Sequence, residues 1–337
     1  MHWLAIIALA VAACLAVYFG TRALLAILHR RQVLDHPNHR SSHDRPVPRG
    51  GGIAVMAVAV VGCWLAALMD PGDSRPLLII ALLAGALAGF SFIDDLRGLP
   101  AAARLILQVL AIAMGCSLLP DAPVFQGLLP PWADRLAAGV CWLWFVNLYN
   151  FMDGIDGISV VETASIGLGI AAVALLTGAA PELAPPAAVI TGAIIGFAFW
   201  NWPPARIFLG DVGSVGLGYL LGWLLLALAT RGQWAAALLL PLYYLSDASW
   251  TLIRRLIRGE KVWRAHRSHF YQYAARRFGS HAKVSRSVLY CNAALLIAAL
   301  AAALTGRAAA ALLTGGVAVG ILLWYFAKVN GKTQHDG

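Results

Sequence analysis

The chain has 337 residues, of which 60% are hydrophobic and only 12% are charged. Average soluble domains carry about 25% charged residues, so this composition, with a mean hydropathy of +0.74, excludes an ordinary soluble protein. The net charge of +9 would suit a nucleic-acid-binding protein, but the basic residues follow membrane topology, and we predict no nucleic-acid partner.

Apolar runs recur along the chain at about 20 residues, the length that crosses a hydrocarbon core of about 30 Å. We predict an all-α polytopic membrane bundle of about 11 transmembrane helices, with ten as the alternative count. It forms one domain over residues 1–330, followed by a short polar tail at 331–337. The first run lacks the basic leader of a signal peptide, so we expect it to be retained. The predicted spans are residues 3–28, 50–69, 76–93, 102–119, 132–149, 158–178, 184–200, 213–230, 232–252, 285–305 and 307–328.

Lys and Arg are divided unequally between the two sets of connections. Cytoplasmic loops of membrane proteins are rich in these residues. We therefore predict an N-terminus outside, a C-terminus in the cytoplasm, and cytoplasmic loops at the five positions named next. Twenty Lys and Arg lie in the C-terminal tail or in and beside the loops near residues 29–49, 94–101, 150–157, 201–212 and 253–284, and four lie on the other side.

The first of these loops reads DHPNHRSSHDRPVPRGGG from Asp35 to Gly52. Arg40, His43 and Arg49 supply donors for phosphate. The triple glycine at the start of the next span allows backbone N–H groups to approach an anion at a helix N-terminus. A basic loop that only sets orientation is the alternative.

The third predicted span ends in FSFIDD, which places Asp94 and Asp95 side by side. Adjacent carboxylates repel each other unless they share a cation or a proton. The pair therefore suggests a Mg²⁺ site, a general base, or both. The alternative is a solvated helix end, which the helix dipole disfavours for acidic residues.

The stretch NLYNFMDGIDGIS at 147–159 joins two apolar spans. Polar groups at membrane depth are costly and are usually functional. A polar connecting loop built from Asx and Gly turns is the alternative. The candidate site residues here are Asn147, Asn150, Asp153 and Asp156.

The segment IFLGDVGS at 207–214 places Asp211 between Gly210 and Gly213. Asp211 could be the N-cap of the next span. With Asp94, Asp95 and Asp153 on the same predicted face, it instead suggests a metal site. Carboxylate oxygens are hard ligands, which suit Mg²⁺ or Mn²⁺ rather than zinc.

The last large loop contains RAHRSHFYQ at 264–272. His266 and His269 are three residues apart and would share a helix face. They could be metal ligands, proton carriers or phosphate donors, and Arg264 and Arg267 beside them favour phosphate. A basic amphipathic surface helix is the alternative.

Two further carboxylates, Glu162 and Asp247, lie inside predicted spans. Each could line the active-site cavity or be a satisfied polar group between helices.

Taken in this order, the five motifs resemble the polyprenyl-phosphate N-acetylhexosamine-1-phosphate transferase superfamily, glycosyltransferase family 4. The resemblance runs from Asp35 to about Tyr273, and RAHRSHFYQ is most similar to the O-antigen-initiating branch. It implies transfer of a sugar-1-phosphate from a UDP-N-acetylamino sugar to undecaprenyl phosphate, with release of UMP. The enzyme would work at the cytoplasmic face of the bacterial inner membrane, in contact with membrane lipids. The resemblance does not identify the sugar, and it leaves open whether the enzyme forms a homodimer.

The resemblance also implies roles for the acidic residues. Asp211 matches the Mg²⁺-binding position, Asp94 a proposed base for the lipid phosphate, and Asp95 its partner. His266 and His269 match two positions of a histidine cluster that has three members in other branches.

The remaining matches concern the nucleotide sugar. Asn150, Asp153 and Asp156 match nucleotide-sugar and active-site contacts. Phe208 matches an aromatic residue that stacks on uracil, and Asn201 matches a polar contact beside it.

Two other classes of membrane protein also carry polar groups or Asp-Gly pairs within helical bundles. A secondary transporter would place its polar groups near the bilayer midplane, within inverted repeats, whereas here they lie at one interface. A CDP-alcohol phosphotransferase would carry Ala-Arg shortly after an Asp-Gly pair, whereas Asp156-Gly157 is followed by Ile158.

Overall fold

The computed structural model describes residues 3–31, 33–35, 46–69, 72–260 and 267–328. Four of the predicted site residues lie outside these ranges: Arg40, His43, Arg264 and His266.

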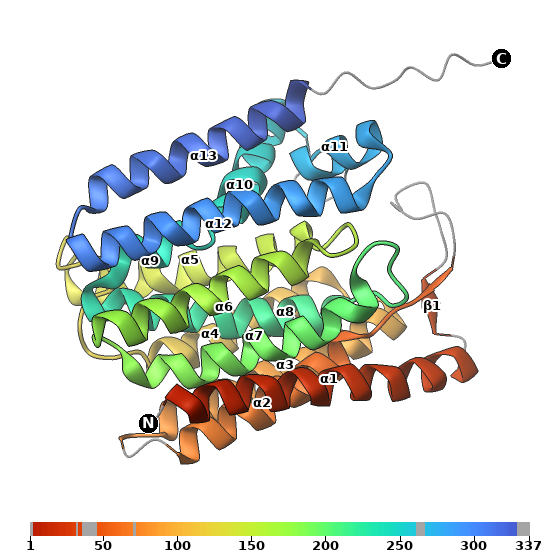
Figure 1. Cartoon of the computed structure of the whole chain (residues 1–337), viewed down its shortest axis with the longest axis horizontal. Coiled ribbons are helices and arrows are strands. Elements are labelled where there is room, and N and C mark those ends of the chain that lie inside the picture. Colours follow the sequence, from red (N-terminus) through yellow and green to blue (C-terminus); the bar gives the residue numbers. More distant parts are fainter. Residues whose placement is uncertain (1–2, 32, 36–45, 70–71, 261–266, 329–337) are drawn as a thin grey trace.

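The chain forms helices joined by short connections, with one two-residue pair of strands (Figure 1). The elements are α1 (Trp3–Arg31), β1 (Leu34–Asp35), β2 (Val47–Pro48), α2 (Gly52–Leu68), α3 (Arg75–Arg97), α4 (Ala101–Cys116), α5 (Pro131–Met152), α6 (Ile158–Thr177), η1 (Pro181–Leu183), α7 (Ala184–Asn201), α8 (Asp211–Leu228), η2 (Ala229–Gln233), α9 (Trp234–Leu239), α10 (Leu242–Ile257), α11 (Phe270–Phe278), α12 (His281–Thr305) and α13 (Ala308–Lys328).

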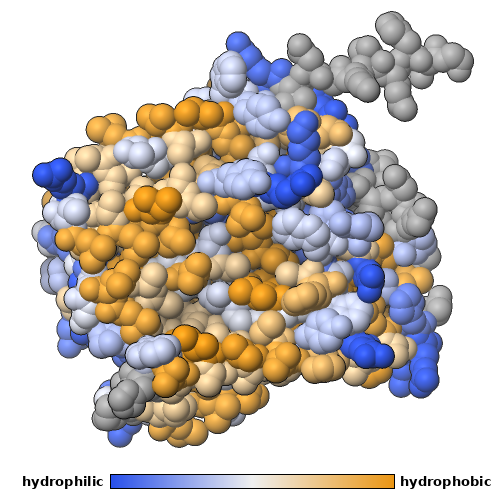
Figure 2. Space-filling model, in the orientation of Figure 1, coloured by the Kyte–Doolittle hydropathy of each residue, from blue (hydrophilic) through white to orange (hydrophobic). Residues whose placement is uncertain are grey.

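The predicted all-α membrane bundle is confirmed. Within the described ranges, seven helical segments are long and apolar enough to cross a membrane, and α2 and α4 are apolar but shorter. Large apolar side chains point outward from α1 at Trp3, Ile7, Val11, Leu15 and Phe19, each more than half exposed. Figure 2 shows hydrophobic residues across the middle of one face, with hydrophilic residues mostly toward its edges. An apolar exterior of this kind is the surface that lipid covers.

The centre of the bundle is α8, which is almost entirely buried. Small residues let neighbouring helices approach closely in membrane proteins. A Cβ atom on Gly216 would lie 2.6 Å from the side chain of Met56 on α2, and one on Gly222 would lie 2.4 Å from Trp142 on α5. The glycines of α8 thus let it pack closely against α2, which follows Arg49, and against α5, which carries Asn147 and Asn150.

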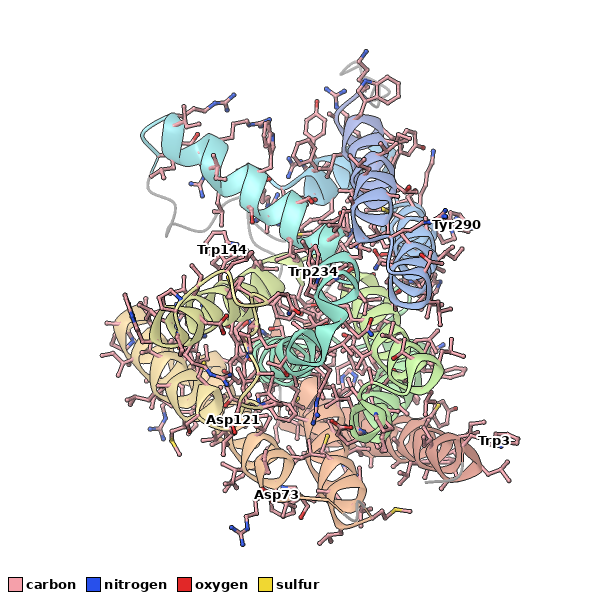
Figure 3. The ribbon with its side chains drawn as sticks, turned by 90° about the vertical axis from the view of Figure 1, so that its left-hand side faces the viewer. Trp3, Asp73, Asp121, Trp144, Trp234 and Tyr290 are labelled. Carbon is pink, nitrogen blue, oxygen red and sulfur yellow. The ribbon has the colours of Figure 1, made fainter. Side chains whose placement is uncertain are left out.

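The predicted span at 232–252 is wrong as a single helix. It comprises the last two residues of η2, the short helix α9, and most of α10, with a turn at Leu240–Pro241 between α9 and α10. Proline lacks the N–H group that would continue the helical ladder. In Figure 3, α10 (cyan) runs outward from the central helices.

The motif segments gather at one end of the bundle, opposite the N-terminus (Figure 1). We call this the motif end, and it contains the last turns of α3, α5 and α7 and the first turn of α8. The strands β1 and β2 also lie there, paired antiparallel with Leu34 opposite Pro48. Figure 3 views the opposite end, where Asp73 and Asp121 lie on connecting loops.

Candidate active site

Two carboxylates from different helices meet on one guanidinium group. Arg49 Nη2 lies 2.9 Å from Asp95 Oδ1 and 2.8 Å from Asp211 Oδ1. The backbone N–H of Asp211 donates to Asp95 Oδ2 at 3.1 Å. The N-cap of α8 is Gly210, with Asp211 as the first helical residue. The predicted acidic residues of α3 and α8 are therefore brought together.

A second arginine joins the same group. Arg104 Nη1, on α4, lies 3.1 Å from Asp94 Oδ2 and 3.9 Å from Asp211 Oδ2. Asp94 is buried, and its Oδ1 accepts the backbone N–H of Leu99 at 2.6 Å. In the sequence, Arg104 was recognised only as one of the basic residues that indicate topology. The sequence did contain a clue to its role, because Arg104 lies three residues after the start of the helix that follows the Asp94-Asp95 pair.

The triple glycine does not present its N–H groups to an anion, contrary to our expectation. Gly50 and Gly51 donate to the carbonyl of Phe208 at 3.2 and 2.8 Å, and Gly52 donates to Leu209 at 2.8 Å. A Cβ atom on Gly52 would lie 2.3 Å from the backbone nitrogen of Gly213. The glycines serve close packing, which holds Arg49 beside the segment that leads into Asp211.

The last turns of α5 carry the predicted asparagines. The helix continues to Met152, beyond the predicted end at residue 149. Asn150 Nδ2 donates to the Ser214 hydroxyl of α8 at 2.8 Å. Asn147 instead faces α4, where its Nδ2 donates to Gln108 Oε1 at 2.8 Å. Asn150 thus lies close to the first turn of α8, which contains Asp211, whereas Asn147 forms its hydrogen bond with a different helix, α4.

Asp153 follows directly after α5. Its Oδ1 accepts a hydrogen bond from the Ser159 hydroxyl at 2.6 Å. Desolvation raises the pKa of Asp153 to about 6, the Ser159 hydrogen bond opposes that shift, and the charge of Asp211 adds to it. The carboxyl group therefore lies within the field of the Asp211 cluster.

Asp156 and Asn201 link the loops of the motif end. Asp156 Oδ2 accepts the backbone N–H of Ala205 at 2.9 Å, and His281 Nδ1 of α12 lies 3.2 Å from its Oδ1. Asn201 Oδ1 accepts the N–H of Gly157 at 3.0 Å, while its Nδ2 donates to Ile207. The described polar bonds of these two side chains connect protein segments to one another. No feature of the sequence singled out His281.

His269 is buried, with only 1% of its surface exposed. Its Nδ1 lies 3.4 Å from Asp247 Oδ1, and its ring stacks on Tyr271. Asp247 also accepts the backbone N–H groups of Phe270 and Tyr271, at 3.0 and 3.1 Å. Asp247 is therefore a satisfied carboxylate that holds the start of α11, which resolves the alternative left open by the sequence.

Glu162 is the second carboxylate that lies inside a predicted span. It is fully buried between α6 and α12, and its Oε2 accepts a hydrogen bond from Asn292 Nδ2 at 2.7 Å. Its Oε1 is buried without a hydrogen-bond partner among the described residues. Glu162 is therefore a polar link between helices that is satisfied at one oxygen only.

The acidic cluster fits a divalent cation in charge and donor type. Among the described residues there is no group of three or more His, Cys, Asp or Glu arranged to hold a metal. Mg²⁺, however, commonly uses only one or two protein carboxylates and takes its other ligands from water and phosphate. Asp95 and Asp211 already converge on a cationic group, Arg49.

Comparison with known proteins decides the family. The sequence profile described as "Glycosyl transferase family 4" matches residues 77–229. Phospho-N-acetylmuramoyl-pentapeptide-transferase of Mycobacterium avium is 32% identical over 268 residues, which are 63% of this chain and 73% of that protein. The chain belongs to glycosyl transferase family 4. This family is the polyprenyl-phosphate N-acetylhexosamine-1-phosphate transferase superfamily that the motifs resemble. The protein is therefore a membrane phosphotransferase of that class.

Two other relatives extend the comparison. A probable undecaprenyl-phosphate N-acetylglucosaminyl 1-phosphate transferase of Bacillus subtilis is 26% identical over 269 residues, 76% of this chain and 73% of that protein. The decaprenyl-phosphate N-acetylglucosaminephosphotransferase of Mycobacterium tuberculosis is 30% identical over 230 residues, 62% of this chain and 57% of that protein. The family profile covers the acidic residues from Asp94 to Asp211, whereas Arg49 and α11 lie outside it.

Proposed function

We propose that the protein transfers an N-acetylated amino-sugar-1-phosphate from a UDP-sugar to undecaprenyl phosphate and releases UMP. The observation that carries this proposal is the convergence of Asp95 and Asp211 on Arg49 at the motif end. The relatives support it, because each of their names describes transfer of an N-acetylated amino sugar together with a phosphate group, and two names specify a polyprenyl phosphate.

The chemistry of this group suits phosphoryl transfer, which needs charge neutralisation and alignment more than covalent catalysis. Asp211 and Asp95 would hold Mg²⁺ or Mn²⁺, and the bound ion would neutralise charge on the pyrophosphate. Arg49 and Arg104 carry two further positive charges beside these carboxylates. Asp94 is the candidate base for the lipid phosphate.

An apolar cavity gives the lipid acceptor a place to lie. It has a volume of about 500 Å³ between α5, α8, α9 and α10, and its lining includes Trp142, Phe145, Leu225 and Leu245. Phe145, on the wall of the cavity, is five residues before Asn150 on α5. Val124 and Gln126, in the loop before α5, line the part of the cavity farthest from the motif end. An isoprenoid chain along α5 would bury apolar surface and direct its phosphate to the motif end.

The placement in the cell is part of the proposal. Twenty Lys and Arg lie on the side of the motif loops and the C-terminal tail, whereas four lie on the opposite side. This difference favours a cytoplasmic motif end in the bacterial inner membrane. The pattern from Arg264 to Gln272 favours initiation of O-antigen or a related cell-envelope polysaccharide.

A donor panel tests the proposal. Purified protein in proteoliposomes with undecaprenyl phosphate and Mg²⁺ should release UMP from UDP-N-acetylhexosamines, and at least tenfold less from UDP-glucose. The Asp211→Asn variant should remain folded and lose turnover. CMP release from a CDP-alcohol, or substrate uptake without nucleotide release, would support one of the rival classes instead.

A further inference from the structure

Three arginine side chains line a second cavity at the motif end. It has a volume of about 390 Å³ and lies between α10, α11 and α13. None of its seven described lining residues is a carboxylate. These residues are Arg254, Arg267, Ser268, Phe270, Tyr273, Arg276 and Ala327. We call it the arginine cavity.

The cavity lies where α13 reaches the membrane–water boundary. Trp324 is 58% exposed on α13, and the ammonium group of Lys328 lies 4.9 Å from the centre of its ring. Aromatic residues beside basic ones are typical of membrane interfaces. Ala327, on the wall of the cavity, is the residue before Lys328. Figure 1 shows α10, α11 and α13 together on one side of the bundle.

Two of the arginines, Arg267 and Arg276, are close enough to influence each other. Arg276 Nη2 donates to the backbone carbonyl of Arg267 at 3.0 Å. Burial lowers the pKa of Arg267, and the charge of Arg276 lowers it further. The Arg254 guanidinium lies 6.0 Å from the centre of the Phe270 ring. Like charges held together at a membrane surface favour an anionic ligand.

We propose that the arginine cavity binds the phosphate group of an anionic phospholipid. Basic pockets between transmembrane helices on the cytoplasmic side bind anionic headgroups. Arginine suits phosphate because its planar group donates two parallel hydrogen bonds. The aromatic rings of Phe270 and Tyr273 would contact the glycerol and the upper acyl chains. This site is additional to the proposed function.

Phosphate at this depth could come from a glycerophospholipid or from polyprenyl phosphate. The helices that line the arginine cavity carry none of the carboxylates of the acidic cluster, which belong to α3 and α8. The polyprenyl acceptor must reach that cluster to react. The arginine cavity is therefore assigned to a phospholipid that remains bound during turnover.

Native mass spectrometry of the detergent-purified protein tests this inference, with phosphatidylglycerol as the probe and phosphatidylcholine as the neutral comparison. The wild type should bind one phosphatidylglycerol at least tenfold more tightly than phosphatidylcholine. Each basic residue near an anionic headgroup contributes about a fivefold factor. The double variant Arg254→Gln/Arg276→Gln should therefore bind phosphatidylglycerol about 25-fold more weakly.

The matched control is Arg31→Gln/Arg286→Gln, which removes the same charge from exposed positions on α1 and α12. It should bind phosphatidylglycerol within about twofold of the wild type. An equal loss of phosphatidylglycerol affinity in both double variants would mean that only the net charge of the protein matters. That result would overturn the specific site. Displacement of phosphatidylglycerol by excess undecaprenyl phosphate would assign the cavity to the acceptor and also overturn it.

A measurement on the wild type alone keeps the inference testable if the glutamine variants unfold. Binding of phosphatidylglycerol should weaken by about tenfold between 0.1 and 0.5 M salt, because exposed charges are screened. Binding that is insensitive to salt would contradict an arginine–phosphate contact. Inorganic phosphate at millimolar concentration should not displace the lipid, and displacement at that level would show a simple anion site.

Discussion

Arg49 Nη2 donates to Asp211 Oδ1 at 2.8 Å, across 162 residues of sequence. The same nitrogen lies 2.9 Å from Asp95. One guanidinium group therefore occupies oxygens that a divalent cation would need. The burial of Arg49 opposes its charge, but the carboxylates of Asp211 and Asp95 outweigh that effect and raise its pKa. A divalent cation held by these carboxylates, as proposed above, would therefore compete with Arg49.

This competition predicts that Arg49→Gln raises the Mn²⁺ affinity of the substrate-free protein by about tenfold, because it removes a positive charge beside both ligands. Electron paramagnetic resonance of free Mn²⁺ measures the affinity without turnover. The control is Arg97→Gln, which changes an exposed arginine in the last turn of α3. An unchanged or weaker Mn²⁺ affinity in Arg49→Gln would contradict competition between Arg49 and the metal ion.

Asp94 has a structural bond as well as a proposed chemical role. In Asp94→Asn the side chain keeps an oxygen for the Leu99 N–H but loses the charge that pairs with Arg104. We expect kcat to fall by about 100-fold, with the Kd for the UDP-sugar within threefold of wild type. Single-turnover kinetics and calorimetry separate the two quantities. Loss of nucleotide-sugar binding at normal kcat would remove Asp94 as the base.

The Arg104→Gln variant is the comparison for that result. If Asp94 acts on the lipid phosphate itself, Arg104→Gln should lose less kcat than Asp94→Asn. Equal losses, without additivity in the double variant, would mean that Asp94 works by positioning Arg104.

Asp247 has a role in stability. Its carboxylate accepts two backbone N–H groups at the start of α11 and the hydroxyl of Tyr243. Asp247→Asn should lower the free energy of unfolding by about 2 kcal/mol, since hydrogen bonds to charged groups contribute more than neutral ones. Thermal unfolding followed by tryptophan fluorescence measures this, with Asp121→Asn on the opposite end as the control. An unchanged midpoint would show that α11 does not depend on Asp247.

Hydropathy and charge patterns were sufficient to predict the helical bundle, because lipid imposes a length and an apolar surface on each span. They did not predict the break at Pro241, since the apolar composition continues through it from Leu240 to Leu242. Proline in an apolar run signals either a kinked helix or two helices, and packing decides between them.

The acidic residues of the candidate site could be named from the sequence, but their partners could not. The Arg49–Asp211 pair depends on how α2 and α3 pack against α8. The same limit applies to the triple glycine, whose N–H groups bond to Phe208 and Leu209. Local patterns show which residues can do chemistry, whereas tertiary packing decides which of them remain free to do it.

Membrane topology yields a separate prediction. Cysteines placed at the exposed positions Arg97 and Arg286, in a cysteine-free background, should react only from the cytoplasmic side. A cysteine at Asp73, on the opposite end (Figure 3), should react only from outside. The same is expected of a cysteine at Leu128, which is exposed in the loop before α5. Opposite compartments for Arg97 and Arg286 would make a shared active site impossible.

The central claim is that a sugar-1-phosphate, and not the sugar alone, moves to the lipid. UDP-N-acetylglucosamine labelled with ³²P at its β-phosphorus tests this directly with purified protein and undecaprenyl phosphate. The account predicts one lipid-linked ³²P for every unlabelled UMP released, and none of either product in Asp211→Asn. Recovery of the label in released UDP, with unlabelled sugar on the lipid, would contradict phosphotransfer and show glycosyl transfer instead.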